Sequence, residues 1–203
     1  MKKLDGNVSA ELTIKKSKFI ANIFVVKNEK EAIEKINEVS KKYFDAKHNC
    51  YAYRVYENNQ VIEKFSDNGE PSGTAGLPML DILKGQDLIN VVSIVTRYFG
   101  GILLGTGGLV KAYSDTTKEA LKEAKIFEVE FGNTYSISIN YDEVKTFENI
   151  CESNKIKILS TNYEENVEII FETIPKKVEI VKSKFYNNTK IELINENVLI
   201  EKL

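Results

Sequence analysis

The feature that most constrains the fold is INVVSIVTRYF, Ile89 to Phe99, a stretch that is nearly continuous in apolar and β-branched residues. A strand with one face in water alternates apolar and polar residues, whereas an unbroken apolar strand needs cover on both faces. The stretch therefore predicts the central strand of a sheet that is packed on both sides. Arg97 stands at the end of this strand, directly before a glycine-rich segment.

Composition limits the number of hydrophobic cores and the kinds of partner that are possible for such a protein. The chain has 203 residues, of which 42% are hydrophobic, and this is enough for one core of ordinary size or two small ones. The formal net charge of −2 excludes a protein that is basic throughout, so any nucleic-acid contact must be local. Residues 1–131 carry 19 Lys and Arg against 18 Asp and Glu, which makes the first half the better candidate for a phosphate contact.

Cysteine usage and the start of the chain indicate the compartment. Cys50 and Cys151 are far apart in the sequence and give neither a disulfide framework nor a zinc site, so we expect free thiols and no metal. The residues after Lys3 contain no apolar signal segment, and no later apolar run approaches ~18 residues. We therefore expect a cytoplasmic protein that makes no membrane contact.

Periodicity and turn residues outline the first half. Strands are expected at residues 10–15 and 19–26, followed by a helix with Asn28 as its N-cap. Two further strands, HNCYAYRVYE and QVIEKFS, are expected to pair through a turn at Asn58-Asn59. Helices are expected near residues 77–83 and from about residue 108 to 125. The apolar stripe of the first helix comprises Ala32, Ile33, Ile36, Val39 and Phe44.

The second half follows a simple alternation. From Thr134 onward the pattern predicts strand, helix, two strands, helix and strand, with the second helix covering residues 175–188. This βαββαβ order is typical of a ferredoxin-like unit. Gly132 and Asn133 are expected to break the chain between the halves, so we predict an α+β protein with domains at residues 1–131 and 132–203.

The segment RYFGGILLGTGG concentrates glycines just before the long helix. It fits neither the P-loop, because Lys111 is misplaced, nor the dinucleotide fingerprint. Glycines ahead of a helix still expose backbone amides to an anion, and Arg97 is close in sequence. The alternative is a glycine turn that only lets helix and sheet approach closely. The anion-binding candidates are Arg97, Gly100, Gly101, Gly105, Thr106, Gly107, Gly108 and Lys111.

An earlier segment, DNGEPSGTAG at residues 67–76, combines acidic, hydroxyl and glycine residues. Asp67 and Glu70 could hold Mg²⁺ or act as an acid and base pair, although hard metals usually need more oxygen ligands. The favoured alternative is that Asp67, Ser72 and Thr74 cap turns and the following helix.

One strand of the first half carries polar candidates on a single face. His48, Cys50 and Arg54 share that face because side chains alternate with period two. A Cys–His dyad lacks an identifiable third group, so a buried thiol is the favoured interpretation. Tyr98 offers either a surface for stacking a base or a part of the core. The cleft candidates are His48, Arg54, Asp67, Glu70, Ser72, Thr74 and Tyr98.

The long helix carries a stripe of lysines. By the helix period, Lys111, Lys118, Lys122 and Lys125 fall in a narrow arc, which is compatible with a contact to a phosphate backbone. Asp115 lies in the same arc, however, and this spacing is also typical of a solvated face with ion pairs. The solvated face is the favoured interpretation.

Several of these motifs together resemble the YigZ/IMPACT family, over about residues 17–121. The resemblance rests on SKFIA (17–21), HNCYAYR (48–54), DNGEPSGTAGLPML (67–80) and VVSIVTRYFGGILLGTGGLVKAY (91–113). The family signature is an aliphatic pair, one residue, arginine, two aromatics, two glycines and a glycine four residues on. It is matched by Ile94, Val95, Arg97, Tyr98, Phe99, Gly100, Gly101 and Gly105. Asn68 stands where many members have a second aspartate, which weakens the idea of paired metal-binding carboxylates.

The resemblance carries expectations about fold and function. It implies a first domain similar to the second domain of small-subunit ribosomal protein five, an α/β sandwich, and a second domain similar to domain V of elongation factor G. Bacterial members have no settled biochemical activity. Eukaryotic relatives add a further module and restrain a kinase pathway that controls translation. The ribosomal-type fold is also shared by small-molecule kinases, whose serine-containing glycine loop differs from LLGTGGLVKA.

Three functional hypotheses remain open from the sequence. The first is a regulator of translation that binds RNA, a ribosome or a translation factor, with no cofactor, near Arg97, the residue 100–108 segment and Lys111. The second is an enzyme that acts on a nucleotide or another phosphate-bearing small molecule in a cleft containing Asp67, Glu70 and Arg97. The third is a module that binds proteins only.

Overall fold

The computed structural model describes residues 1–185 and 190–202, and it has two compact units, Met1–Glu128 and Val129–Leu203. Strands β2 to β6 form one five-stranded sheet, and β1 and β7 to β10 form another. Each unit also contains helices, so the protein is α+β with two domains, as the sequence predicts. The predicted end of the last helix, near residue 188, lies outside the described residues. Within the described residues, no helix combines the length and the apolar character that a membrane crossing requires.

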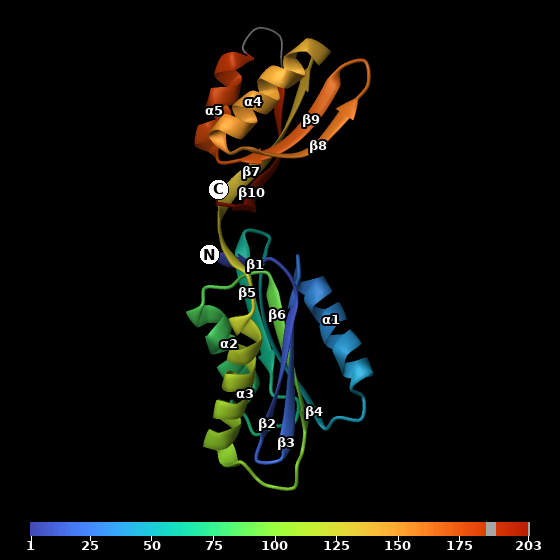
Figure 1. Ribbon diagram of the computed structural model, residues 1–203, viewed down its shortest axis with the longest axis vertical. Helices are drawn as coiled ribbons and strands as arrows, with labels where there is room; N and C mark the ends of the chain where they lie inside the picture. Colours follow the sequence, from blue (N-terminus) through green and yellow to red (C-terminus); the bar gives the residue numbers. More distant parts are fainter. Residues whose placement is uncertain (186–189, 203) are drawn as a thin grey trace. The chain divides into compact units, whose positions relative to one another are not determined.

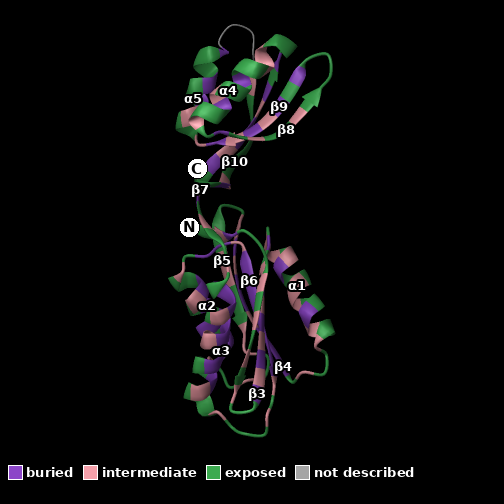
Figure 2. Ribbon diagram, in the orientation of Figure 1, coloured by how far each residue is buried: buried purple, intermediate pink, exposed green. Residues whose placement is uncertain are grey.

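The first unit is built on an antiparallel sheet with the strand order β2-β3-β6-β4-β5. The central strand is β6 (Val91–Tyr98), in which every residue from Val91 to Arg97 is buried (Figure 2). This confirms the central strand that the apolar run predicts. The other strands are β2 (Val8–Ile14), β3 (Ser17–Val25), β4 (His48–Glu57) and β5 (Gln60–Ser66).

Helices cover both faces of this sheet (Figure 1). Helix α1 (Glu29–Lys42) packs on one face, while α2 (Gly76–Gly85) and α3 (Gly105–Lys122) pack on the other. Each face therefore has a core of its own. The larger core includes Phe19, Ala21, Cys50, Met79, Leu83, Val95 and Tyr113. The smaller one includes Val26, Ala32, Val39, Tyr53, Val55, Val92 and Ile94.

Local sequence signals account for two of these elements. The side chain of Asn28 accepts a hydrogen bond of 2.9 Å from the backbone N–H of Glu31 and so caps α1. Asn58 and Asn59 adopt φ values of 52° and 60°, which suit the tight turn that joins β4 to β5. Both predictions are confirmed. Of the predicted stripe on α1, Ala32 and Val39 are buried, whereas Ile33 is exposed and Phe44 lies beyond the helix, 84% exposed.

Two features of the first unit differ from the sequence predictions. A short strand, β1 (Lys2–Leu4), is absent from the prediction and pairs with the beginning of β7 (Ile126–Ile139). Helix α3 begins at Gly105, three residues before the predicted start, so Gly105–Gly108 form its first turn instead of a loop. Glycine disfavours helix in isolation, and the packing of Leu109 and Tyr113 on the sheet outweighs that preference here.

The second unit has the predicted βαββαβ order, with β10-β7-β9-β8 as its strand order. After β7 come a short 3₁₀ turn at Tyr141–Glu143, α4 (Val144–Asn154), β8 (Lys157–Tyr163), β9 (Val167–Thr173), α5 (Pro175–Lys184) and β10 (Ile191–Glu201). Its core packs Phe147 against Phe171 and Phe185. Strand β7 runs unbroken through Gly132 and Asn133, so the predicted break there is wrong. Gly132 instead makes room for Ile200, since a Cβ at this position would lie 2.3 Å from its Cδ1.

Candidate functional site

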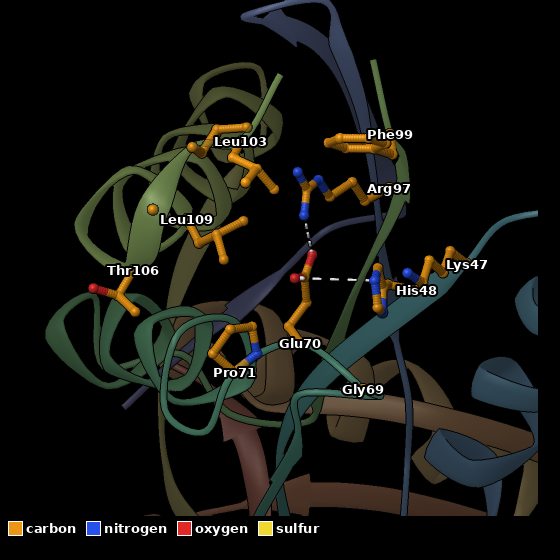
Figure 3. Close-up of a pocket in the computed structure, with 12 residues that line it drawn as sticks. Lys47, His48, Gly69, Glu70, Pro71, Arg97, Phe99, Leu103, Thr106 and Leu109 are labelled. Carbon is orange, nitrogen blue, oxygen red and sulfur yellow. Dashed lines mark hydrogen bonds and ion pairs between the residues drawn. The ribbon is translucent and has the colours of Figure 1, made fainter. Parts of the chain in front are cut away.

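A cavity of about 410 Å³ opens in the first unit beside the ends of β4 and β6. His48 at the start of β4 and Arg97 near the end of β6 lie directly opposite each other in the sheet. Both side chains therefore point to the same face. The lining consists of Lys47, His48, Gly69, Glu70, Pro71, Arg97, Phe99, Leu103, Leu104, Gly105, Thr106 and Leu109 (Figure 3). Residues from both glycine-containing segments thus meet at one cavity.

The polar centre of the cavity wall is an ion pair between Arg97 and Glu70. The Nη1 atom of Arg97 donates to Oε1 of Glu70 across 2.7 Å, and the two side chains are only 6% and 4% exposed. The pair is joined by a single hydrogen bond and is not bidentate, as guanidinium–carboxylate pairs often are. Arg97 therefore keeps donor capacity beyond this contact.

The remaining surroundings of Arg97 are mainly aromatic. Its guanidinium carbon lies 5.5 Å from the ring centre of Phe19 and 5.6 Å from that of Phe99. Nη2 makes a long contact of 3.5 Å with Oγ of Ser17, and the buried Nε atom has no hydrogen-bond partner within the described residues. The cation is thus positioned by packing as much as by hydrogen bonds.

Glu70 has two further neighbours in the cavity wall. The hydroxyl of Tyr113 donates to Oε1 of Glu70 across 2.8 Å. Burial raises the pKa of Tyr113 far above its ordinary value, so its hydroxyl stays neutral and remains a donor. Nε2 of His48 lies 4.0 Å from Oε2 of Glu70, while Nδ1 of His48 contacts the carbonyl oxygen of Asn68 at 2.8 Å. Because a carbonyl only accepts, Nδ1 carries a proton, and Nε2 faces the carboxylate.

The first glycine-containing segment is organised by Asp67 as a cap. Its carboxylate accepts hydrogen bonds of 2.8 to 2.9 Å from the backbone N–H groups of Gly73, Ala75 and Gly76. Thr74 donates from its hydroxyl to the carbonyl oxygen of Pro71. These bonds hold the turn before α2, as the capping interpretation predicts, and they turn Asp67 away from the role of a metal ligand. Within the described residues, no three His, Cys, Asp or Glu side chains form a group suited to a metal ion.

The second glycine-containing segment has two distinct parts. Gly100 lies against the turn between β2 and β3, where an added Cβ would approach the carbonyl of Lys16 to 2.0 Å. Beyond it, Ile102 and Leu103 are exposed, and Leu103 reaches 83% exposure beside the cavity. The chain then enters α3 without any side-chain cap, with Gly105 and Thr106 on the cavity wall.

Some sequence candidates do not line the cavity. Arg54 is further along β4, where it bonds Glu63 and the carbonyl oxygen of Leu88. Tyr98 points to Asp45, to which its hydroxyl donates across 2.8 Å. The residues that do not line the cavity are Arg54, Asp67, Ser72, Thr74, Tyr98, Gly100, Gly101, Gly107, Gly108 and Lys111.

The surroundings of Cys50 and of the lysine stripe agree with the structural interpretation of each. Burial raises the pKa of the Cys50 thiol to about 12, and its sulfur lies 2.9 Å from the carbonyl oxygen of Asp67. A buried thiol with a raised pKa stays protonated near neutral pH, which agrees with the buried-thiol interpretation of Cys50. On α3, Lys122 pairs with Glu119 at its exposed surface, which agrees with the solvated interpretation of the lysine stripe.

Sequence reasoning missed several residues of the cavity wall. One of them is Lys47, which directly precedes His48. Two others are Leu103 and Leu104, a pair of apolar residues within a glycine-rich segment. The leucine pair is a usable signal, because apolar side chains that gather at a protein surface often mark a ligand-binding groove. Pro71 and Leu109 complete the apolar wall, and nothing in their immediate sequence marks them out.

Comparison with known proteins gives a consistent assignment. Residues 15–121 match a family model described as the Impact N-terminal domain, and residues 137–190 match one described as a domain of unknown function, DUF1949. "IMPACT family member YvyE" of Bacillus subtilis is 40% identical over 185 residues, which cover 91% of this chain and 82% of that protein. "Protein IMPACT-B" of Xenopus tropicalis is 35% identical over 127 residues, which cover 55% of this chain and 39% of that protein.

A solved structure supports the same assignment. It is described as "Crystal structure of an hypothetical protein", is 30% identical, and superimposes with a TM-score of 0.67. The match covers 97% of this chain and 98% of that chain. Two successive family domains and a bacterial relative matched over most of its length show that this chain belongs to the YigZ/IMPACT family.

Proposed function

We propose that this protein regulates translation by binding RNA, and that the cavity in the first unit is the centre of the RNA-binding surface. Family membership supports the translational role, because the family resemblance implies translation control for eukaryotic members. The choice of RNA as the partner rests on the charges and rings around the cavity. The anion-binding candidates Arg97, Gly105 and Thr106 line this cavity. Gly107, Gly108 and Lys111 follow in α3, and Gly100 and Gly101 lie in the segment that joins β6 to α3.

The observation that carries the proposal is a local surplus of positive charge. Arg97 and Lys47 line the cavity against the single carboxylate of Glu70. Lys15 and Lys16 occupy the neighbouring turn, against which Gly100 packs. All three lysines are exposed, and none has an ion-pair partner within the described residues. Unpaired cations on a chain of net charge −2 mark a local contact for phosphate groups.

An aromatic ring accompanies these cations. Phe99 is 52% exposed and lies next to Arg97 on the cavity wall. A half-exposed ring beside cations is the arrangement with which proteins stack the bases of single-stranded nucleic acid. Protein–protein interfaces are depleted in lysine relative to the rest of the surface, so exposed lysines without ion-pair partners favour RNA at this site.

Salt dependence provides the test. We expect a short single-stranded RNA to bind with an affinity that falls linearly on a logarithmic salt axis, measured by fluorescence anisotropy. The triple variant K15A/K16A/K47A should lower the steepness of that line by about 2, because each lost phosphate contact contributes roughly 0.7 for single strands. The control is K27A/K118A/K125A, which removes three exposed lysines elsewhere in the same unit and should leave the line unchanged.

Three outcomes would contradict the proposal. Absence of RNA binding at physiological salt is the first, and equal weakening by both triple variants is the second. The third is capture of a protein partner that survives high salt and nuclease treatment, which would indicate protein recognition at this surface. Turnover of a nucleotide by the purified protein would favour the enzyme hypothesis instead.

A further inference from the structure

We propose that the cavity takes a terminal phosphate carried on a single nucleotide unit, with the phosphate at the first turn of α3 beside Arg97 and the ring against Phe99 and Leu103. This inference deepens the proposed function and rests on the same site. Its chemistry is that of a phosphate monoester, which occurs both at the end of an RNA strand and in a free nucleotide.

The start of α3 supplies donors for such a phosphate. The first amides of a helix have no partner inside the helix, and no side chain caps this one. Gly105 and Thr106 line the cavity, and Gly105, Thr106 and Gly107 are all exposed. The helix dipole adds a partial positive charge at the same place.

Gly107 is a glycine that the fold itself does not require. A Cβ built at this position meets no atom within 4 Å, and the residue does not have the positive φ that favours glycine. Glycine inside a helix is less favourable than alanine, so its presence here lowers stability without any return in packing. A Cβ at residue 107 would tilt toward the start of the helix, where the exposed amides are. A bare backbone at this position is explained by a ligand that must approach it.

Arg97 points to a ligand independently of the helix. The residue is 5% exposed, and its Nε atom is buried without a hydrogen-bond partner in the part of the chain that the structure describes. Figure 3 shows its guanidinium extending into the space between Phe99 and Leu103. Nε itself has no accessible surface and is out of reach of a ligand. The two terminal nitrogens carry more N–H groups than the single bond to Glu70 and the long contact of 3.5 Å with Ser17 use, so they can bond an acceptor that enters the cavity.

Depth and charge favour a terminal phosphate over an internal one. An internal phosphate carries a nucleotide on both sides and cannot bring its oxygens to a side chain that is 6% exposed. A terminal phosphate has three free oxygens and a single substituent that leads outward. It also carries between one and two negative charges at neutral pH, which suits a wall where Arg97 and Lys47 outweigh Glu70. The volume of about 410 Å³ is that of a site for one small ligand.

Matched probes test the inference directly. We would measure binding of one RNA decamer with a 5′-phosphate, with a 3′-phosphate and with hydroxyl groups at both ends, at constant salt. We expect one of the phosphorylated forms to bind at least tenfold more tightly than the hydroxyl form. A nucleoside monophosphate should displace it, and the corresponding nucleoside should not.

The variant Gly107→Ala separates ligand contact from folding. We expect it to raise the unfolding temperature and to abolish the preference for the phosphorylated end. The control is Gly85→Ala at the end of α2, an exposed helical glycine whose added Cβ also meets no atom within 4 Å. It should raise the unfolding temperature without changing the preference.

Each result decides between the two proposals. Equal affinity for the phosphorylated and hydroxyl RNAs overturns the terminal-phosphate site and leaves RNA binding standing, and so does an unchanged preference in Gly107→Ala. Binding of the nucleoside monophosphate without binding of any RNA supports the site, with a free nucleotide as its source, and contradicts the RNA proposal. Failure of every probe to bind overturns both.

Discussion

Glu70 and Arg97 are separated by 27 residues in sequence, yet their side chains meet across 2.7 Å in an almost fully buried ion pair. The pair joins the segment before α2 to the end of the central strand. Taking two charges out of water is expensive, so a buried pair of this kind is weak support for stability by itself. Its position in the wall of a cavity instead suits a site in which the two charges contact a ligand.

The pair makes a prediction for stability. Arg97→Met should lower the free energy of unfolding by about 3–5 kcal/mol, because it leaves the carboxylate of Glu70 buried without a counter-charge. The double variant E70L/R97M should recover most of that loss, since it removes both charges. Urea denaturation followed by circular dichroism measures both values. Losses that simply add in the double variant would show that the two side chains do not interact.

The buried thiols give a prediction for reactivity. Burial raises the pKa values of Cys50 and Cys151 to about 12, so neither thiol ionises appreciably near neutral pH. A colourimetric thiol reagent at pH 8 should therefore react with both cysteines only after denaturant is added. Rapid reaction of either thiol in the native protein would contradict this.

The same pKa shift fixes the direction of a pH effect on stability. A raised pKa in the folded state means that the contribution of Cys50 is fully present below its ordinary value of 9.0 and is lost as the pH rises toward about 12. The free energy of unfolding should fall more steeply above pH 9 in the natural protein than in Cys50→Ala. Chemical denaturation at a series of pH values, with the slopes compared, provides the measurement.

Asp67 makes a prediction about the loop that holds Glu70. Because its carboxylate accepts three backbone N–H bonds, Asp67→Ala should lower the free energy of unfolding by about 1.5–3 kcal/mol. Asp67→Asn keeps an acceptor oxygen and should lose less. The control is Asp81→Ala on the exposed side of α2, which should change the value by no more than about 0.5 kcal/mol. Equal effects at both positions would remove the capping role of Asp67.

Gly100 makes a prediction about close packing. An added Cβ would lie 2.0 Å from the backbone of Lys16, so Gly100→Ala should destabilise by about 1–3 kcal/mol or more. Gly6→Ala is the matched control, because a Cβ there meets nothing within 4 Å. Thermal unfolding of the two variants separates the crowded position from the open one. An unchanged unfolding temperature in Gly100→Ala would mean that the turn between β2 and β3 shifts to make room for the added Cβ.

What the sequence could predict was determined by short-range physics. The cap at Asn28, the turn at Asn58-Asn59 and the buried strand from Val91 each depend on neighbouring residues, and the structure confirms them. The order of elements in the second unit follows from periodicity in the same way. These signals are local, so one sequence is enough to read them.

Long-range pairing set the limit of prediction. The sequence placed Glu70 and Arg97 in one hypothetical cleft, but it held no information on their distance or on Tyr113 as a common neighbour of Glu70. The short strand β1 forms only because β7 lies beside it, and β7 continues through Gly132 because packing against Ile200 outweighs the weak strand preference of glycine. The early start of α3 has the same cause, since tertiary packing overrides local preference there.

The direct opposition of His48 and Arg97 on β4 and β6 ties the cavity to the alignment of these strands. A slip of one residue would turn one of the two side chains to the other face of the sheet, where α1 packs, and the polar wall would not assemble. Any molecule that binds in the cavity therefore selects the correctly aligned sheet from its misaligned competitors. A bound ligand therefore stabilises the native alignment of β4 and β6 against alternative alignments.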